Sequence, residues 1–127
     1  MLLMASRDPE ALRAAAGVPI DVSAAGRGVV VLAEDEPAVA TALSARFACA
    51  VVLVVGEHEL AVYRDGLRIR HIVTDEDGTR LAGERLPFED DLLDFDDDAG
   101  DDAQHLHLDV DIIEDYCARL GIDVRLA

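Results

Sequence analysis

The N-terminal half of the chain alternates apolar runs with segments that begin like helices. Asp-Pro-Glu at residues 8–10 and Asp-Glu-Pro at residues 35–37 each supply an N-cap residue, an early proline and a first-turn acid. Helices are therefore expected to begin there, and Gly17 is expected to end the first one. A brief strand is expected within residues 18–22. Residues 1–5 predict a short first strand, and the apolar runs 29–33 and 49–55 predict strands that are buried on both faces.

The middle third has the pattern of an antiparallel meander. Residues 59–64 alternate apolar and polar positions, and Asp65-Gly66 is a strong two-residue hairpin turn because both residues tolerate a left-handed backbone. The segment 80–88 is expected to add an edge strand that ends at Pro87. On the return strand, one face is expected to carry Arg68, Arg70 and Ile72, and the other Leu67, Ile69 and His71.

The C-terminal third predicts a final helix and a closing strand. Residues 110–121 are expected to form the helix, ended by Gly121, and residues 122–127 a short alternating strand. The alternation of residues 105–110 also favours an extended segment before the helix. A single core-facing stripe is expected on the helix: Val110, Ile113, Cys117 and Leu120.

Together these elements predict one α+β domain over residues 1–127, with an acidic loop at about residues 89–104. The expected architecture is a mainly antiparallel sheet of five or six strands with two or three helices packed on one face. The strand–helix order at the start leaves open a ferredoxin-like or a partly parallel arrangement. Aromatic residues make up only 4% of the chain, so the core is expected to be aliphatic.

The formal net charge of −16 is unevenly distributed. Residues 1–85 carry thirteen acids and nine arginines, whereas residues 86–127 carry fourteen acids and two arginines. Such a charge argues against nucleic acid as a direct ligand and against anionic membranes, since both require a basic surface. The asymmetry favours a local acidic patch that engages a basic protein partner over a general adaptation to salt.

Nine of the fourteen residues from 89 to 102 are acidic, and their mutual repulsion demands solvent, cations or a partner. A solvated loop is the plainer interpretation, but Leu92, Leu93 and Phe95 interrupt the run and favour a contact segment. The predicted partner-binding residues are Glu89, Asp90, Asp91, Asp94, Asp96, Asp97, Asp98, Asp101 and Asp102.

A metal site is the alternative. An EF-hand beginning at Asp94 fails, because positions 6 and 12 would be Ala99 and His105 in place of glycine and glutamate. His105, His107 and Asp109 would share one face of a strand and could hold zinc or iron. Loose binding of a divalent cation by the aspartates is also left open, and no other cofactor is expected.

No segment carries an enzymatic signature. The serines lack a nucleophile-elbow context, neither cysteine has an activating neighbour, and the paired acids Glu57 and Glu59 flank His58 at a turn. Cys49 and Cys117 are expected to be buried, reduced thiols. No secretory signal or membrane span is evident, which predicts a cytoplasmic, non-enzymatic protein.

The segment 60–90 resembles a stretch of small uncharacterised actinobacterial α+β proteins. It has a strand, an Asp-Gly turn, an arginine-bearing return strand, and then Gly-Glu-Arg-Leu-Pro-Phe-Glu at residues 83–89. The resemblance implies a bacterial α+β domain and carries no catalytic residues. The sequence as a whole therefore predicts an interaction protein, such as a toxin-neutralising immunity protein or a nucleic-acid mimic.

Overall fold

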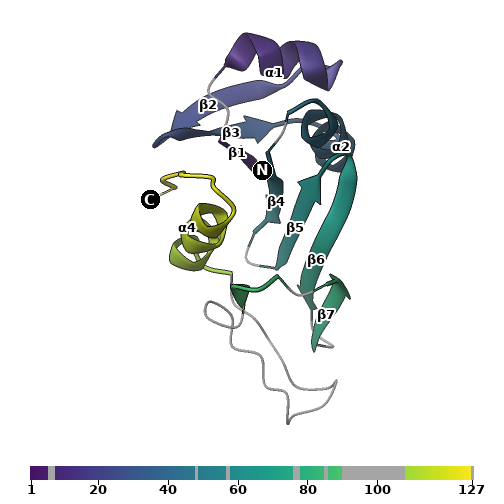
Figure 1. Cartoon of the computed structure of the whole chain (residues 1–127), viewed down its shortest axis with the longest axis vertical. Helices are drawn as coiled ribbons and strands as arrows, with labels where there is room; N and C mark the ends of the chain where they lie inside the picture. Colours follow the sequence, from purple (N-terminus) through teal and green to yellow (C-terminus); the bar gives the residue numbers. More distant parts are fainter. Residues whose placement is uncertain are drawn as a thin grey trace.

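An antiparallel sheet forms the centre of the molecule (Figure 1). The computed structural model describes residues 1–5, 8–47, 49–56, 58–75, 78–84, 86–89 and 108–126. Within these residues the sheet has seven strands in the order β2-β3-β1-β4-β5-β6-β7, one or two more than expected from the sequence. The strands are β1 (Leu2–Met4), β2 (Asp21–Ala25), β3 (Gly28–Leu32), β4 (Val51–Val55), β5 (Glu59–Arg64), β6 (Leu67–Asp75) and β7 (Gly78–Gly83).

The first six elements have a ferredoxin-like arrangement. Helices α1 (Pro9–Ala16) and α2 (Glu36–Arg46) give the chain order β-α-β-β-α-β, and strands β2-β3-β1-β4 lie side by side, all antiparallel. Both helices begin as predicted, because the side chains of Asp8 and Asp35 accept hydrogen bonds from the amides of Ala11 and Ala38. Gly17 ends α1 in a left-handed conformation, with φ of 71°.

Apolar side chains cover both faces of the sheet and divide the core into two layers. Along β1, Leu2 and Met4 face one layer and Leu3 faces the other, as the period of a strand requires. Leu12 of α1 and Leu43 of α2 belong to the first layer. These two helices therefore pack on one face, as predicted.

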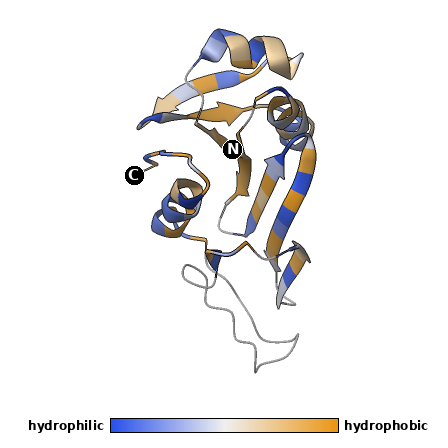
Figure 2. Cartoon of the chain, in the orientation of Figure 1, coloured by the Kyte–Doolittle hydropathy of each residue, from blue (hydrophilic) through white to orange (hydrophobic). Residues whose placement is uncertain are grey.

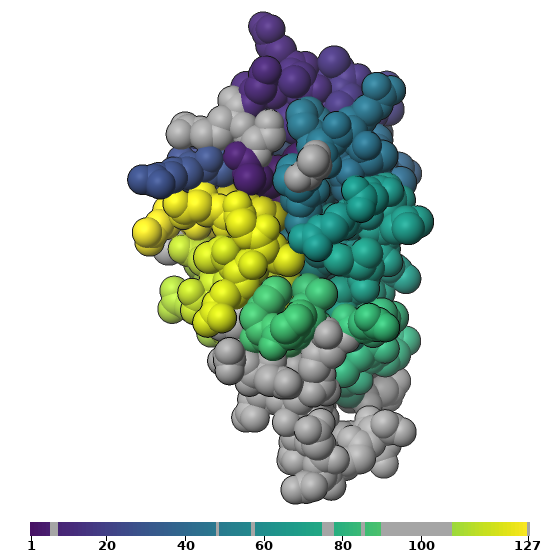
Figure 3. All heavy atoms as spheres, in the orientation of Figure 1, coloured from purple at the N-terminus to yellow at the C-terminus, as the bar shows by residue number. Residues whose placement is uncertain are grey.

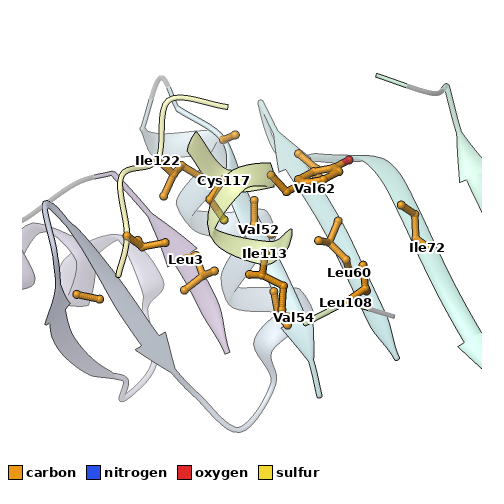
Figure 4. Packing of buried hydrophobic residues seen from close by; sticks show 14 residues of the cluster. Leu3, Val52, Val54, Leu60, Val62, Ile72, Leu108, Ile113, Cys117 and Ile122 are labelled. Carbon is orange, nitrogen blue, oxygen red and sulfur yellow. The ribbon is translucent and has the colours of Figure 1, made fainter. Parts of the chain in front are cut away.

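Helix α4 (Val110–Arg119) packs on the opposite face of the sheet (Figure 4). Ile113 and Cys117 point into this second layer, as predicted, and meet Val52 of β4. Two details of the predicted stripe were wrong: Val110 is 42% exposed, whereas Tyr116, which was not included, is fully buried. Figure 3 shows the yellow C-terminal residues resting against the teal residues of the middle third.

The segment after α4 is not a strand, contrary to the prediction. Ile122 and Val124 are nevertheless buried, and Asp123 and Arg125 between them are exposed, so the predicted alternation of side chains is correct. Backbone hydrogen bonds tie the segment to the β2–β3 turn: the Arg27 amide donates to the carbonyl of Asp123, and the Arg125 amide to that of Ala25. Two bonds hold the segment without building a continuous ladder.

Strands β5, β6 and β7 form the predicted meander, in which β5 and β6 join at Asp65 and Gly66 with φ of 55° and 79°. The edge strand β7 begins earlier than predicted and ends at Gly83, so its predicted end at Pro87 was wrong. Figure 2 shows polar and apolar residues alternating along β6. The register shifts between Val62 and Tyr63: Val62 pairs with Arg70, but Tyr63 pairs with Arg68. This bulge separates Arg68 from Arg70, which the sequence placed on one face.

Candidate functional site

The candidate site is the acidic segment between β7 and α4, which we define as residues 90–107. The structure describes the residues on either side of it. Glu89 closes the described part before the segment, and Leu108 and Asp109 open the part after it. The other predicted partner-binding residues lie outside the described residues, and so do two of the three predicted metal ligands: Asp90, Asp91, Asp94, Asp96, Asp97, Asp98, Asp101 and Asp102, and His105 and His107.

Glu89 does not belong to an exposed acidic surface. Its side chain is fully buried, and its carboxylate lies between the sheet and α4, where Arg70 and Tyr116 reach it. Assigning Glu89 to the partner-binding residues was therefore wrong. A buried carboxylate requires partners that compensate for its lost hydration, and Glu89 has them on three sides.

Arg70 supplies the first of these partners. Its Nη2 donates to Oε1 of Glu89 at 2.8 Å, and its Nε lies 3.2 Å from Oε1 and 3.1 Å from Oε2. The remaining nitrogen, Nη1, donates to the carbonyl oxygens of Ala82 and Gly83 on β7, at 3.4 and 3.1 Å. Arg70 pairs with Val62 and lies two residues from Ile72, so it faces the layer that α4 covers, and only 2% of its surface is exposed.

Tyr116 and the backbone supply the other partners of Glu89. The Tyr116 hydroxyl donates to Oε2 at 2.9 Å, and the Leu86 amide donates to the same oxygen at 3.0 Å. Phe88 packs edge-on against the Tyr116 ring, with centroids 4.9 Å apart. Burial, together with the neighbouring carboxylate, raises the pKa of Tyr116 above its ordinary value, so the hydroxyl stays protonated and continues to donate.

These contacts form a buried anchor, which we define as Arg70, Glu89 and Tyr116. The anchor joins β6, the segment before the acidic run, and α4, although Arg70 and Tyr116 lie nineteen and twenty-seven residues from Glu89 along the chain. Its chemistry is structural, since the charge of Glu89 is fully engaged inside the protein. Sequence reasoning missed it, although the apolar residues before Glu89 and the position of Tyr116 three residues after Ile113 were both signals of burial.

Asp109 acts as a helix cap. Its Oδ1 accepts a hydrogen bond from the Ile112 amide at 2.9 Å, and its extended backbone precedes α4. The preceding residue, Leu108, is buried in the same layer as α4. The acidic segment is therefore held at both ends, by Glu89 on one side and Leu108 on the other.

The other described side chains that could bind a metal ion or react lie apart from one another. Within the described residues, no three His, Cys, Asp or Glu side chains are grouped to hold a metal ion. Both cysteines are free, as expected, although Cys49 is only half-buried. Burial raises the pKa of both thiols, that of Cys117 to about 12, which suppresses their reactivity. His71 Nε2 contacts Oε2 of Glu59 at 2.6 Å on the neighbouring strand.

Comparison of the chain with protein-family models, curated proteins and solved structures gave no match. No helix among the described residues is long and apolar enough to cross a membrane. The fold class and the anchored ends of the acidic segment are thus the firm basis for a functional proposal.

Proposed function

We propose that this protein is a non-enzymatic interaction protein whose acidic segment binds a basic surface on a partner protein. The binding residues are the aspartates that follow the buried Glu89: Asp90, Asp91, Asp94, Asp96, Asp97, Asp98, Asp101 and Asp102. Asp96, Asp97, Asp98, Asp101 and Asp102 are the most closely spaced of these and supply the strongest field.

The observation that carries the proposal is the tethering of this charge. A free acidic tail would only keep the chain in solution, whereas this segment begins at a fully buried ion pair and ends at a buried leucine. Holding both ends lowers the conformational entropy that the segment loses on binding. The anchor therefore supports a docking role over a purely solvating one.

The partner that fits is a protein with a dense cluster of arginine or lysine. Carboxylates presented in this way can occupy a cleft that otherwise receives phosphates, as an immunity protein or a nucleic-acid mimic does. Complementary charge accelerates encounter more than it strengthens the final complex, so association should be fast and sensitive to salt.

The proposal is tested with two variants of equal net charge. The acidic-segment variant replaces Asp96, Asp97, Asp98, Asp101 and Asp102 with asparagine. The surface control neutralises five exposed acids elsewhere, Glu10→Gln, Asp21→Asn, Glu34→Gln, Glu84→Gln and Asp115→Asn. Binding of a fluorescent arginine-rich peptide at low salt is expected to weaken at least about tenfold in the first variant only.

Equal weakening in both variants would overturn the proposal, because net charge alone would then explain binding. Binding unchanged in the acidic-segment variant would overturn it as well. Circular dichroism on both variants checks that the fold is retained.

A further inference from the structure

An apolar groove lies between the end of β4 and the first turn of α4. It has a volume of about 540 Å³. Figure 4 shows three of its lining residues, Val54, Leu108 and Ile113, close together where α4 faces the sheet. The other apolar side chains that line it are Met1, Val55, Val110 and Leu126.

Two of these lining residues are among the exposed large apolar side chains of the described residues. Val55 is 48% exposed and Val110 is 42% exposed, and both face the same groove. Deeper in the groove, Leu108 and Ile113 are already buried and continue into the core layer beneath α4. The groove is therefore an open extension of the core, and covering it would remove further apolar surface from water.

Two exposed acids flank Val110, which lines the groove. Asp109, the N-cap of α4, and Asp111, in its first turn, are both exposed next to Val110, although neither lines the groove itself. The charged groups that line the groove itself, Glu36 and the Met1 amino group, pair with each other, so the two aspartates are the acids beside Val110 that a basic partner could meet. No arginine is among the residues that line it.

The acidic segment enters the fold at this same place. Leu108 lines the groove, and Asp102 precedes it by six residues, a stretch that spans at most about 20 Å. A partner that engages the aspartates therefore has the groove within reach.

We propose that the groove receives a large apolar side chain of the basic partner, flanked there by arginines or lysines that meet Asp109 and Asp111. The inference rests on the proposed function and extends it by naming a second contact, apolar in character. A second copy of this chain does not fit, because a net charge of −16 makes two copies repel each other. Anionic lipid is disfavoured for the same reason.

Two fluorescent peptides of equal charge serve as probes. One carries a Leu-Leu pair between arginines, and the other carries Ser-Ser at the same positions. The wild-type protein is expected to bind the leucine peptide at least about tenfold more tightly, because only leucine fills the groove.

Val110→Asp is expected to abolish this preference, so that both peptides bind alike. The substitution adds an acid at the first helical position, where it favours the helix, so the fold is retained. The matched control is Leu67→Asp, which adds the same charge at an exposed leucine that does not line the groove, and it should keep the preference.

Each outcome separates the two proposals. Equal binding of both peptides by the wild-type protein, with binding lost in the acidic-segment variant, would overturn the groove and leave the acidic docking surface standing. A preference that survives Val110→Asp would also overturn the groove. Absence of binding by either peptide at low salt would overturn both.

Discussion

Arg70 and Glu89 face each other inside the protein, with Nη2 of the arginine 2.8 Å from Oε1 of the glutamate. Nineteen residues of sequence separate them, and the most acidic segment of the chain begins directly after Glu89. The pair thus fixes, inside the core, the residue that directly precedes that segment. Its energetic role follows from burial, since neither charge can be hydrated if its partner is removed.

Breaking this pair should destabilise the protein strongly. Glu89→Gln keeps the shape of the side chain but leaves the Arg70 charge buried and uncompensated, which should cost about 3–5 kcal/mol of the free energy of unfolding. Urea denaturation followed by circular dichroism measures the loss. Glu84→Gln, at an exposed position, should change stability by less than about 0.5 kcal/mol. A loss below about 1 kcal/mol in Glu89→Gln would contradict the buried ion pair.

Removing both charges should restore much of that loss. The double variant Arg70→Met with Glu89→Leu replaces the pair by apolar side chains of similar volume, an exchange that is often neutral or stabilising. It is expected to be more stable than Glu89→Gln in the same urea experiment. If the double variant were the less stable of the two, the ion pair would add to the stability of the fold beyond offsetting the burial of its own two charges.

The Tyr116 hydroxyl should contribute measurably through Glu89. Tyr116→Phe removes a hydrogen bond to a buried charged group and should cost about 1.5–3 kcal/mol. Tyr63→Phe, which removes a hydroxyl on the opposite face of the sheet, is the matched comparison. Equal decreases in the free energy of unfolding from the two substitutions would show that the hydrogen bond to Glu89 does not stabilise the protein.

Stability should fall in alkaline solution because of Cys117. Burial raises the pKa of its thiol from 9.0 to about 12, so the folded protein holds this proton over a range in which the unfolded chain releases it. Below pH 9 the buried thiol therefore does not change the free energy of unfolding. Above pH 9 it lowers that free energy by up to about 1.4 kcal/mol per pH unit. Urea titrations at pH 9 and pH 10 should show a smaller drop for Cys117→Val than for wild type. An identical drop in both proteins would count against the buried thiol.

Substitutions of Asp109 can distinguish its role as a helix cap from a role as a metal ligand. Asp109→Ala should cost about 0.5–2 kcal/mol through loss of the cap, whereas Asp109→Asn should remain close to wild type because asparagine caps equally well. Thermal melts with and without zinc measure both effects. Zinc that stabilises the wild type but not Asp109→Asn would instead identify Asp109 as a ligand alongside His105 and His107.

Local signals in the sequence were sufficient for most of the fold. Asp8 and Asp35 start their helices and Asp65 begins the hairpin turn, because caps and turns depend on a few neighbouring residues. The side on which α4 packs was not predictable in this way. Its apolar stripe shows that it packs against something, but only the occupation of the other face by α1 and α2 leaves the second face to α4.

The site was less predictable than the fold for a related reason. Glu89 is the first residue of an acidic run, and composition alone assigns it to the surface with its neighbours. Its burial depends on Arg70, which shares the α4 face of β6 with Ile72, and on Tyr116 of α4, and no short-range signal brings these residues to Glu89. The exposure of Val110 is likewise a tertiary effect, because a groove between the end of β4 and the first turn of α4 leaves this side chain partly uncovered.

The central claim, that the acidic segment captures a basic partner, is tested most directly by association kinetics. Stopped-flow mixing with an arginine-rich peptide over a series of salt concentrations gives the association rate constant for wild type, the acidic-segment variant and the surface control. We predict a rate that falls steeply with ionic strength for wild type and the surface control, and a slow, nearly salt-independent rate for the acidic-segment variant. Identical salt dependence in the two variants would contradict the claim.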